Sequence, residues 1–342
     1  MTRSPKFHLC LHRCALALGF AALLAGCSPE PEAPPVTRAF SSSRFEPAQP
    51  VTGQPFTITD LALEMEPIAA GTFRMGSPVN EPGRGANEGP QTVVSISRPF
   101  WLGRTPVTHG QWKAIMGTDL TGQAQKASAS DNDFIQLLAR CDDATAMYFV
   151  NWHEAMAFCE KLNARARADG SLPAGYEFTL PTEAQWEYAC RAGTTDATYA
   201  GPLPIMDDNS APVLDPIAWY AGNSGVGYDG PPWGSIVAVG KPAANGRSGP
   251  RQVGGKQPNA WGLYDMLGNV RQWCRDFPAE VLPGGSVTDP TGPATGSDRV
   301  VRGSSWHSDP GYCRAALRAW SSPDSRVQFI GFRVALTPKT NR

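Results

Sequence analysis

Residues 259–273 constrain the fold most strongly, because large apolar side chains alternate there with glycines and oxygen-bearing side chains. Neither the helical nor the strand period continues for long, so the segment predicts a tight, buried loop. Two interpretations are open. In one, oxygen atoms turn inward and hold a hard cation such as calcium, from Asp265, Gly268, Val270 and Gln272. In the other, which the spacing alone favours, the segment is a glycine turn held by an Asx hydrogen bond.

Composition limits the class of protein. The 342 residues include 35 Gly, 32 Pro and 10 Trp, which indicates a loop-rich body with aromatic anchors and not a helical bundle or a repeat array. The formal net charge of −1 leaves no basic excess for a phosphate backbone, so we expect no nucleic-acid partner. The 8 cysteines form neither a CxxC motif nor a Cys/His cluster, so no zinc site is expected.

The N-terminus predicts a secretion signal over residues 1–27. Basic residues precede a short apolar run at 15–24, and Leu-Ala-Gly-Cys ends the run at Cys27. This ending resembles a bacterial lipobox, in which Cys27 carries lipid chains such as palmitate; the alternative is an ordinary signal-peptidase site. Ser28 stands where an inner-membrane retention signal would favour Asp. The resemblance therefore implies the periplasmic side of the outer membrane, with the lipid anchor as the only membrane contact.

The rest of the chain divides into a tether and one domain. Residues 28–55 are rich in Pro, Ser, Ala and Glu and poor in large apolar residues, so they predict a disordered tether. Residues 56–342 predict a globular domain of the α+β class, in which short helices are separated by strands and long loops. Capping boxes at 108–111 and 181–185, and Asn151 as a cap, predict three helices. Strands are predicted at 68–77, 93–102 and 178–180.

Five blocks follow one another along the domain, at 70–77, 150–155, 180–190, 259–273 and 302–306 with 331–333. Together they resemble the successive blocks of the formylglycine-generating enzyme family, the sulfatase-modifying factors, across about residues 62–336. The resemblance implies a single domain of C-type-lectin-like ancestry with little regular secondary structure. It leaves the function open, because that fold carries several functions.

The resemblance also implies calcium sites. The second family site matches Asp265, Gly268, Val270 and Gln272. Gln272 stands where the family usually has Glu, and Arg271 stands where it has an aromatic residue, so we expect weakened calcium affinity in a preserved geometry. In the first site, the Asn223 side chain and the Ser224 carbonyl match, but the completing loop is replaced by residues 226–250.

The catalytic cysteine pair of the family, which binds copper(I), is broken. Counted from the Gly-Ser-Ser turn, Cys313 matches the second cysteine and Ser308 replaces the first; counted back from residues 323–325, neither position is cysteine. A hard, neutral hydroxyl cannot replace a thiolate on copper(I), so no copper site is expected. The resemblance further implies that Cys313 pairs with Cys190 in a disulfide, in an oxidising periplasm.

We therefore expect a binding module for a protein, peptide or envelope ligand. Exposed aromatic side chains beside Arg and Asp are typical of binding hot spots, although Trp306 and Trp320 could equally fill a core. The alternative is an oxygen-dependent enzyme of the formylglycine-generating or siderophore-maturation type, acting on an exported substrate. The expected binding face consists of Trp306, His307, Asp309, Tyr312, Trp320, Ser322 and Arg326.

Overall fold

The computed structural model divides the chain into two units, Met1–Phe45 and Glu46–Arg342, and every element below belongs to the second. The expected signal peptide, Cys27 and residues 28–49 of the expected tether lie outside the described residues. The described residues are 50–127, 138, 141–206, 210–231 and 247–339.

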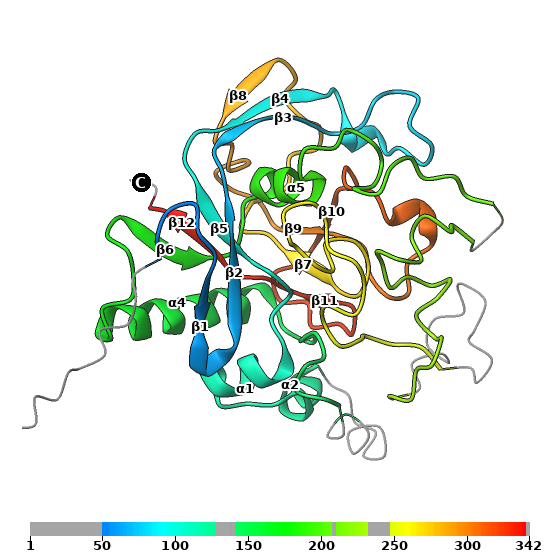
Figure 1. The fold of residues 1–342 in the computed structure, drawn as a ribbon. Helices are drawn as coiled ribbons and strands as arrows, with labels where there is room; N and C mark the ends of the chain where they lie inside the picture. Colours follow the sequence, from blue (N-terminus) through cyan, green and yellow to red (C-terminus); the bar gives the residue numbers. More distant parts are fainter. Residues whose placement is uncertain (1–49, 128–137, 139–140, 207–209, 232–246, 340–342) are drawn as a thin grey trace, which may run out of the picture. The chain divides into compact units, whose positions relative to one another are not determined.

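A five-stranded antiparallel sheet joins the two ends of the domain (Figure 1). The last strand, β12, lies between β5 from the N-terminal part and β6 from the middle of the chain. Ala335 pairs with both Leu102 and Thr179, so the sheet forms only when the C-terminal segment is in place. In sheet order, the strands are β1 (Phe56–Ile58), β2 (Leu63–Ile68), β5 (Phe100–Gly103), β12 (Ala335–Pro338) and β6 (Tyr176–Thr179).

Two smaller sheets complete the strand content. The strand expected at 93–102 is divided, because β4 ends at Ile96 and β5 belongs to a different sheet. Pro99 has no N–H to donate at this break, and the Ser97 N–H donates to Asp289 Oδ1 at 2.9 Å. The three-stranded sheet contains β3 (Gly71–Met75), β4 (Thr92–Ile96) and β8 (Ser286–Thr288). The four-stranded sheet contains β10 (Ala319–Ser321), β9 (Arg299–Arg302), β7 (Arg271–Trp273) and β11 (Ile330–Gly331).

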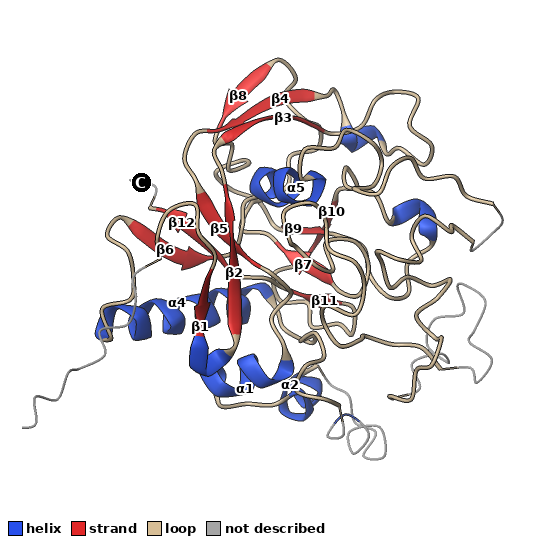
Figure 2. Cartoon of the chain, viewed as in Figure 1, coloured by secondary structure: helices blue, strands red, loops and turns tan. Residues whose placement is uncertain are grey.

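The three expected helices are confirmed, with their caps (Figure 2). Thr108 and Thr182 each form a capping box with a glutamine three residues later, and Asn151 does so with Glu154. A further short helix, α2, was not predicted; the Asp119 side chain caps it by accepting from Gly122 N at 2.9 Å. The helices are α1 (His109–Met116), α2 (Leu120–Lys126), α4 (Trp152–Ala168) and α5 (Glu183–Arg191).

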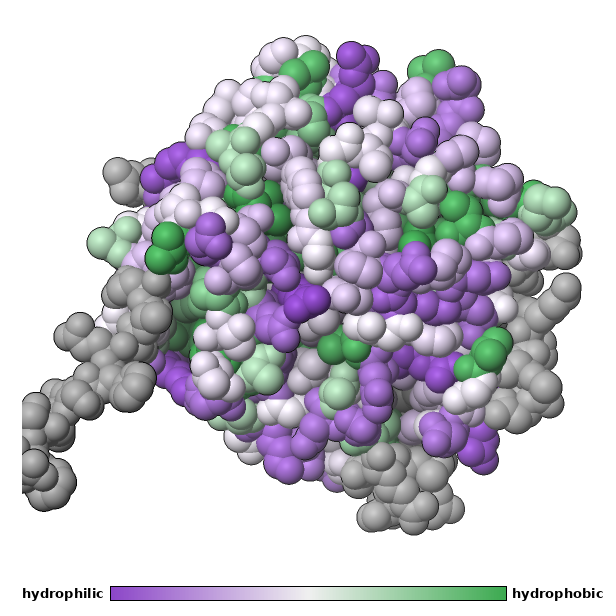
Figure 3. Space-filling model, viewed as in Figure 1, coloured by the Kyte–Doolittle hydropathy of each residue, from purple (hydrophilic) through white to green (hydrophobic). Residues whose placement is uncertain are grey.

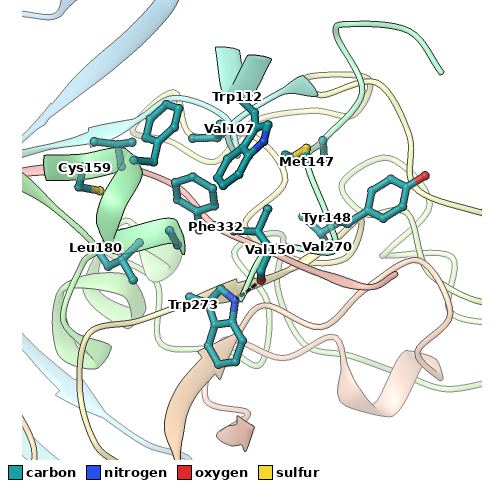
Figure 4. Close-up of a cluster of buried hydrophobic side chains, with 14 of the residues drawn as sticks. Val107, Trp112, Met147, Tyr148, Val150, Cys159, Leu180, Val270, Trp273 and Phe332 are labelled. Carbon is teal, nitrogen blue, oxygen red and sulfur yellow. Dashed lines mark hydrogen bonds between the residues drawn. The ribbon is translucent and has the colours of Figure 1, made fainter. Parts of the chain in front are cut away.

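Aromatic side chains from distant segments form one of the two hydrophobic clusters (Figure 4). Trp112 of α1 stacks on Phe158 of α4, and Phe332 meets both rings edge-on, with the Phe158 centroid 5.3 Å away. Trp273 is fully buried and donates from Nε1 to the Val150 carbonyl at 2.8 Å. A buried indole with a satisfied N–H both fills volume and fixes the position of the neighbouring chain.

The tight loop that the sequence predicts at 259–273 is present over 259–270, with 265–270 buried, whereas Arg271–Trp273 forms strand β7. Asn259 Oδ1 accepts from the main-chain N–H groups of Trp261 and Leu263 at 3.0 and 3.2 Å, which is the expected Asx hydrogen bonding. Gly268 has a φ of 77°, and a Cβ there would lie 2.3 Å from the Trp219 carbonyl oxygen. Only glycine fits at this position, since both the backbone conformation and the close approach exclude a side chain.

Ion pairs with little or no solvent exposure connect the hairpin region, α5 and the C-terminal segment. Glu187 of α5 accepts from Arg191 Nε at 2.9 Å and forms a second pair with Arg302 of β9. Arg314 makes a bidentate pair with Glu88, at 2.6 and 2.7 Å. Arg318 makes a similar bidentate pair with Glu183, at 2.8 and 2.9 Å. Such charges are retained in an interior because each one is paired.

The exterior is mixed in character. On the face seen in Figure 3, hydrophobic residues form small separate spots among hydrophilic ones. Among the helices in the described ranges, none is both long and apolar enough to cross a membrane.

Candidate functional site

Cys313 is the only cysteine of the expected catalytic segment, and it is fully buried. It follows a short 3-10 helix, η4 (Pro310–Tyr312), and its Sγ donates to Ser304 Oγ at 3.5 Å. Burial raises the pKa of the thiol to about 12, against smaller lowering effects of the Ser304 hydrogen bond and the Arg271 charge. The sulfur is therefore a neutral thiol at neutral pH, whereas a copper ligand must be a thiolate.

Ser308 and Cys190 do not complete a site around Cys313. Ser308 Oγ lies 3.0 Å from Ser305 Oγ and accepts from the Ser305 N–H at 3.2 Å, so its hydroxyl is used within its own turn. The expected disulfide between Cys190 and Cys313 was wrong, because both residues are buried free thiols. The Cys313 sulfur is directed towards Ser304 and the main-chain oxygen of Asp309.

His307 packs among aromatic rings beside this turn. Its Nδ1 lies 3.0 Å from Ser305 Oγ, and its ring centroid lies 4.3 Å from that of Phe329. Burial, and then the charge of Arg271, lowers the pKa of His307 to about 4, so the ring is neutral at neutral pH. Ser305 is fully buried, and the Ser305–His307 pair therefore presents no nucleophile to solvent.

Arg271 is a residue of this region that the sequence pattern does not single out. It begins β7, and its main-chain N–H donates to the Phe329 carbonyl at 2.8 Å. Its Nε is buried and has no hydrogen-bond partner among the described residues. Burial lowers the pKa of the guanidinium, while the nearby Cys313 and Tyr312 raise it. The available signal was its position, since it stands where the resembled family has an aromatic residue.

The remaining residues of the expected binding face separate into exposed and buried members. Trp306 is a core residue, with 1% of its surface exposed, and its Nε1 donates to a main-chain carbonyl at 3.2 Å. Tyr312 and Trp320 are 52% and 43% exposed, as binding anchors must be. Arg326 Nε is held at 3.1 Å from Glu154 Oε2 of α4. Of the other two residues, Ser322 is exposed and Asp309 is half-buried.

One expected ligand of the second calcium site, Gln272, is used in other contacts. Gln272 Oε1 accepts from Trp186 Nε1 at 2.7 Å and from Arg333 Nε at 2.6 Å, which uses both of its lone pairs. Its Nε2 donates to the Asp265 main-chain oxygen at 2.7 Å, so the prediction of Gln272 as a calcium ligand is corrected. The buried Asp265 carboxylate accepts from the Gly254 N–H at 2.7 Å and from Asn269 Nδ2 at 3.3 Å. Gly268 and Val270 lie in the same buried turn.

At the first expected calcium site, an arginine occupies the position of a cation. The Ser224 carbonyl accepts from Arg251 Nε at 3.0 Å, and the same guanidinium donates to the carbonyls of Val226 and Gly227. The Asn223 amide is used in closing the preceding turn, by accepting from the Tyr220 N–H at 3.1 Å. Three carbonyls thus meet a guanidinium where the resemblance implied a calcium ion.

The chemistry that the C-terminal face offers is that of hydrogen-bonding and charged side chains. Within the described ranges, no three His, Cys, Asp or Glu side chains come together as a group that could hold a metal ion. What the C-terminal face does present is an exposed phenol at Tyr312, a neutral His307 and the positive charge of Arg271. Such groups can donate hydrogen bonds to a ligand and hold it in place.

Comparison with known proteins identifies the family. The family described as "Sulfatase-modifying factor enzyme 1-like domain" matches residues 47–338. The formylglycine-generating enzyme of Thermomonospora curvata is 27% identical over 323 residues, covering 82% of this chain and 95% of that protein. The bovine formylglycine-generating enzyme is 28% identical over 240 residues, and the chain spans about half of its length, 50%.

A solved structure has the same fold. Treponema denticola variable protein 1 superimposes with a TM-score of 0.59 at 27% sequence identity, covering 82% of this chain and 98% of that one. The match of the family to residues 47–338 includes every helix and strand described above. The chain therefore belongs to the family of the sulfatase-modifying factor enzyme 1-like domain.

Proposed function

We propose that this domain binds a protein or peptide of the cell envelope and does not oxidise cysteine to formylglycine. The observation that carries the proposal is the state of Cys313. It is a single, fully buried thiol with a pKa raised by burial to about 12, and Ser308 stands in place of a second cysteine. Two thiolates are the ligands that suit copper(I), and this segment supplies none at neutral pH.

The catalytic half of the proposal is tested with a peptide that carries a sulfatase-type cysteine. The purified domain is loaded with copper(I) and incubated aerobically with the peptide and a reductant, and the peptide mass is then measured. We expect no conversion of the thiol to an aldehyde, in the wild type or in Cys313→Ser. Turnover by the wild type that disappears in Cys313→Ser would overturn the proposal.

The binding half rests on the exposed aromatic residues of the C-terminal region. Tyr312 and Trp320 expose about half of their surfaces, and large rings of this kind dominate binding energy in protein interfaces. We expect the Tyr312→Ala/Trp320→Ala double variant to lose most of its capture of envelope proteins from a membrane extract. Val51→Ala, which removes an exposed apolar side chain near the start of the described domain, is the matched control. Equal capture by the double variant and the wild type would exclude this surface.

The proposed location is the periplasmic side of the outer membrane, with the domain attached through lipid on Cys27. The proposal rests on the sequence alone, on the small residues before Cys27 and on Ser28 after it. Each buried methylene of a lipid chain contributes about 0.8 kcal/mol, so more than one chain is needed for stable attachment.

A further inference from the structure

A small cavity lies where segments from all three sheets meet the N-terminus of α5. Its volume is about 70 Å³, whereas one water molecule needs about 10–15 Å³ of such space, so the cavity admits a group of several heavy atoms. Main-chain hydrogen bonds hold its walls together, from Asp289 N to the Ser95 carbonyl at 2.9 Å and from Arg275 N to the Pro181 carbonyl at 3.0 Å. The polar side chains that line the cavity include Arg98, Thr182, Gln185, Arg275, Asp289 and Thr337.

Two arginines bring positive charge to this cavity. Arg98 follows β4, and its Nη2 donates to the Lys339 carbonyl at 3.1 Å. Arg275 follows β7, and its main-chain carbonyl accepts from Arg299 Nη1 at 2.6 Å, which fixes the start of the side chain. Within the part of the chain that the structure describes, neither guanidinium forms an ion pair with a carboxylate. Two like charges at one cavity repel each other, and an anion between them relieves that repulsion.

The neutral polar groups of the cavity are available as hydrogen-bond donors. Thr337 of β12 is only 3% exposed, yet no hydrogen bond of the described residues uses its hydroxyl, which lines the cavity. A buried hydroxyl is normally hydrogen-bonded, so this one is expected to meet a ligand. Thr182 Oγ1 accepts from the Gln185 N–H at 3.1 Å, which leaves its own O–H free to donate. Gln185 Oε1 accepts from the Thr182 N–H at 2.9 Å, which leaves its amide N–H groups.

One carboxylate, that of Asp289, also lines the cavity, but its oxygen atoms are already in use. Oδ1 accepts from the Ser97 N–H at 2.9 Å, and Oδ2 accepts from the Ser97 hydroxyl. Two arginines and one aspartate give the lining a net charge of +1. The N-terminus of α5, where Thr182 is the cap, adds a partial positive charge. A small, positive cavity rich in donors suits an oxyanion with several acceptor oxygens.

We propose that this cavity binds a phosphate group between Arg98 and Arg275, with a hydrogen bond from the Thr337 hydroxyl. The planar fork of arginine matches phosphate oxygens, and the N-terminus of a helix favours an anion. The phosphate is either the free inorganic ion or the phosphate of a lipid headgroup. None of the residues of the expected binding face lines this cavity, so the inference stands apart from the proposed binding function.

The direct test is calorimetric titration of the purified protein with inorganic phosphate at constant ionic strength. We expect saturable binding, and Arg98→Met and Arg275→Met should each weaken it by at least about tenfold, because a charge-assisted hydrogen bond is lost. Arg74→Met, which removes an exposed positive charge from β3 outside the cavity, is the control and should bind like the wild type. Absence of saturable binding, or wild-type affinity in the Arg98→Met/Arg275→Met double variant, would overturn the site.

Two conservative variants test the geometry if an arginine variant fails to fold. Thr337→Val keeps the shape of the side chain and removes its hydroxyl, so phosphate should bind about fivefold more weakly. Asp289→Asn keeps an acceptor for Ser97 and removes a negative charge, so phosphate should bind more tightly. Unchanged affinity in both variants would overturn the site. Acetate that binds as tightly as phosphate would overturn the assignment to a phosphate group.

Vesicles then separate the two sources of the phosphate. The Cys27→Ala protein, which cannot carry lipid on that residue, is sedimented with vesicles of phosphatidylcholine that contain phosphatidylglycerol. Cosedimentation that inorganic phosphate displaces and that Arg275→Met abolishes would assign the site to a lipid headgroup. Phosphate binding without cosedimentation would assign it to the free ion. Cosedimentation that persists in the Arg98→Met/Arg275→Met double variant would overturn the headgroup assignment, since the cavity would not be the contact.

Discussion

A single buried residue, Asp276, is expected to make the stability of this fold depend on pH. Its carboxylate is almost fully buried and accepts from the Glu183 N–H at 2.9 Å, at the first turn of α5. Burial, and then the negative charge of Glu183, raises the pKa of Asp276 to about 7. The native state therefore keeps a proton on Asp276 over a pH range in which the unfolded chain has lost it.

The first prediction concerns Asp276→Asn, which keeps an acceptor oxygen and cannot ionise. The folded pKa lies above the ordinary value of 3.8. Protonated Asp276 therefore makes its full contribution to the free energy of unfolding below about pH 4. That contribution is lost as the pH rises through about 7. One pKa unit corresponds to about 1.4 kcal/mol, so over this pH range the wild type loses up to a few kcal/mol of stability that Asp276→Asn retains.

This is checked by denaturant unfolding of both proteins at about pH 5 and about pH 8. The advantage of Asp276→Asn should grow with pH. Glu280→Gln, which neutralises an exposed acid, is the control and should show no such trend. A stability difference that is the same at both pH values would mean that Asp276 does not titrate in this range.

At the scale of elements, α5 holds three segments together through Glu187. This carboxylate is fully buried and receives the Gly76 N–H at 2.9 Å, Arg191 of the same helix and Arg302 of β9. The turn after β3, helix α5 and the inner strand β9 of the four-stranded sheet therefore share one counter-ion. Removing its charge leaves two buried arginines with fewer partners.

The second prediction is that Glu187→Gln destabilises the domain by about 3–5 kcal/mol, as expected when one partner of a buried ion pair is removed. Glu64→Gln is the matched control, because Glu64 pairs with Arg104 at a site where the two side chains are 48% and 39% exposed. That change should cost less than about 1 kcal/mol. Similar losses in the two variants, measured by denaturant unfolding, would contradict this account.

The third prediction concerns the loop around Arg251. The positively charged guanidinium of Arg251 donates hydrogen bonds to three main-chain carbonyls. It also lies 4.4 Å from the ring centroid of Trp219. Arg251→Met keeps the aliphatic volume but removes the donors, so the melting temperature should fall.

The wild type and Asp265→Asn should each melt at the same temperature in excess calcium and in chelator.

Differential scanning fluorimetry with and without calcium makes this measurement. A ligand that binds only the native state must raise the melting temperature with its concentration. A calcium-dependent rise in the wild type that disappears in Asp265→Asn would restore the second calcium site and contradict the assignment of Gln272. Unchanged stability of Arg251→Met would show that the three carbonyls do not need the guanidinium.

At the scale of the whole molecule, the fourth prediction concerns attachment to the membrane. Cys27→Ala removes the thiol that would be lipidated, so the protein should move from the membrane fraction to the soluble periplasm. Fractionation and metabolic labelling with a fatty-acid analogue measure this. Cys159→Ala, which removes a buried thiol within α4, is the control and should remain membrane-bound. Continued lipid labelling of Cys27→Ala would contradict lipidation at this residue.

The sequence by itself determined the local features of this protein. The caps of α1, α4 and α5, the Asx hydrogen bonds of Asn259 and the glycine turn at Gly268 all depend on residues a few positions apart. Such contacts form whenever the residue types stand at the right spacing, which is why pattern alone predicts them. The family was also evident from the sequence, because the five blocks follow one another in the order that the family has.

Only the tertiary structure decided which charged and polar groups meet. Gln272 is bound by Trp186 and Arg333, which lie 86 and 61 positions away, and a sequence pattern cannot show that its lone pairs are used. The same holds for the burial of the Cys313 thiol and for the unpartnered Nε of Arg271. Desolvation and charge pairing depend on the packing of distant segments, so local signals predicted the capped helices and the turns but not the chemistry of the site.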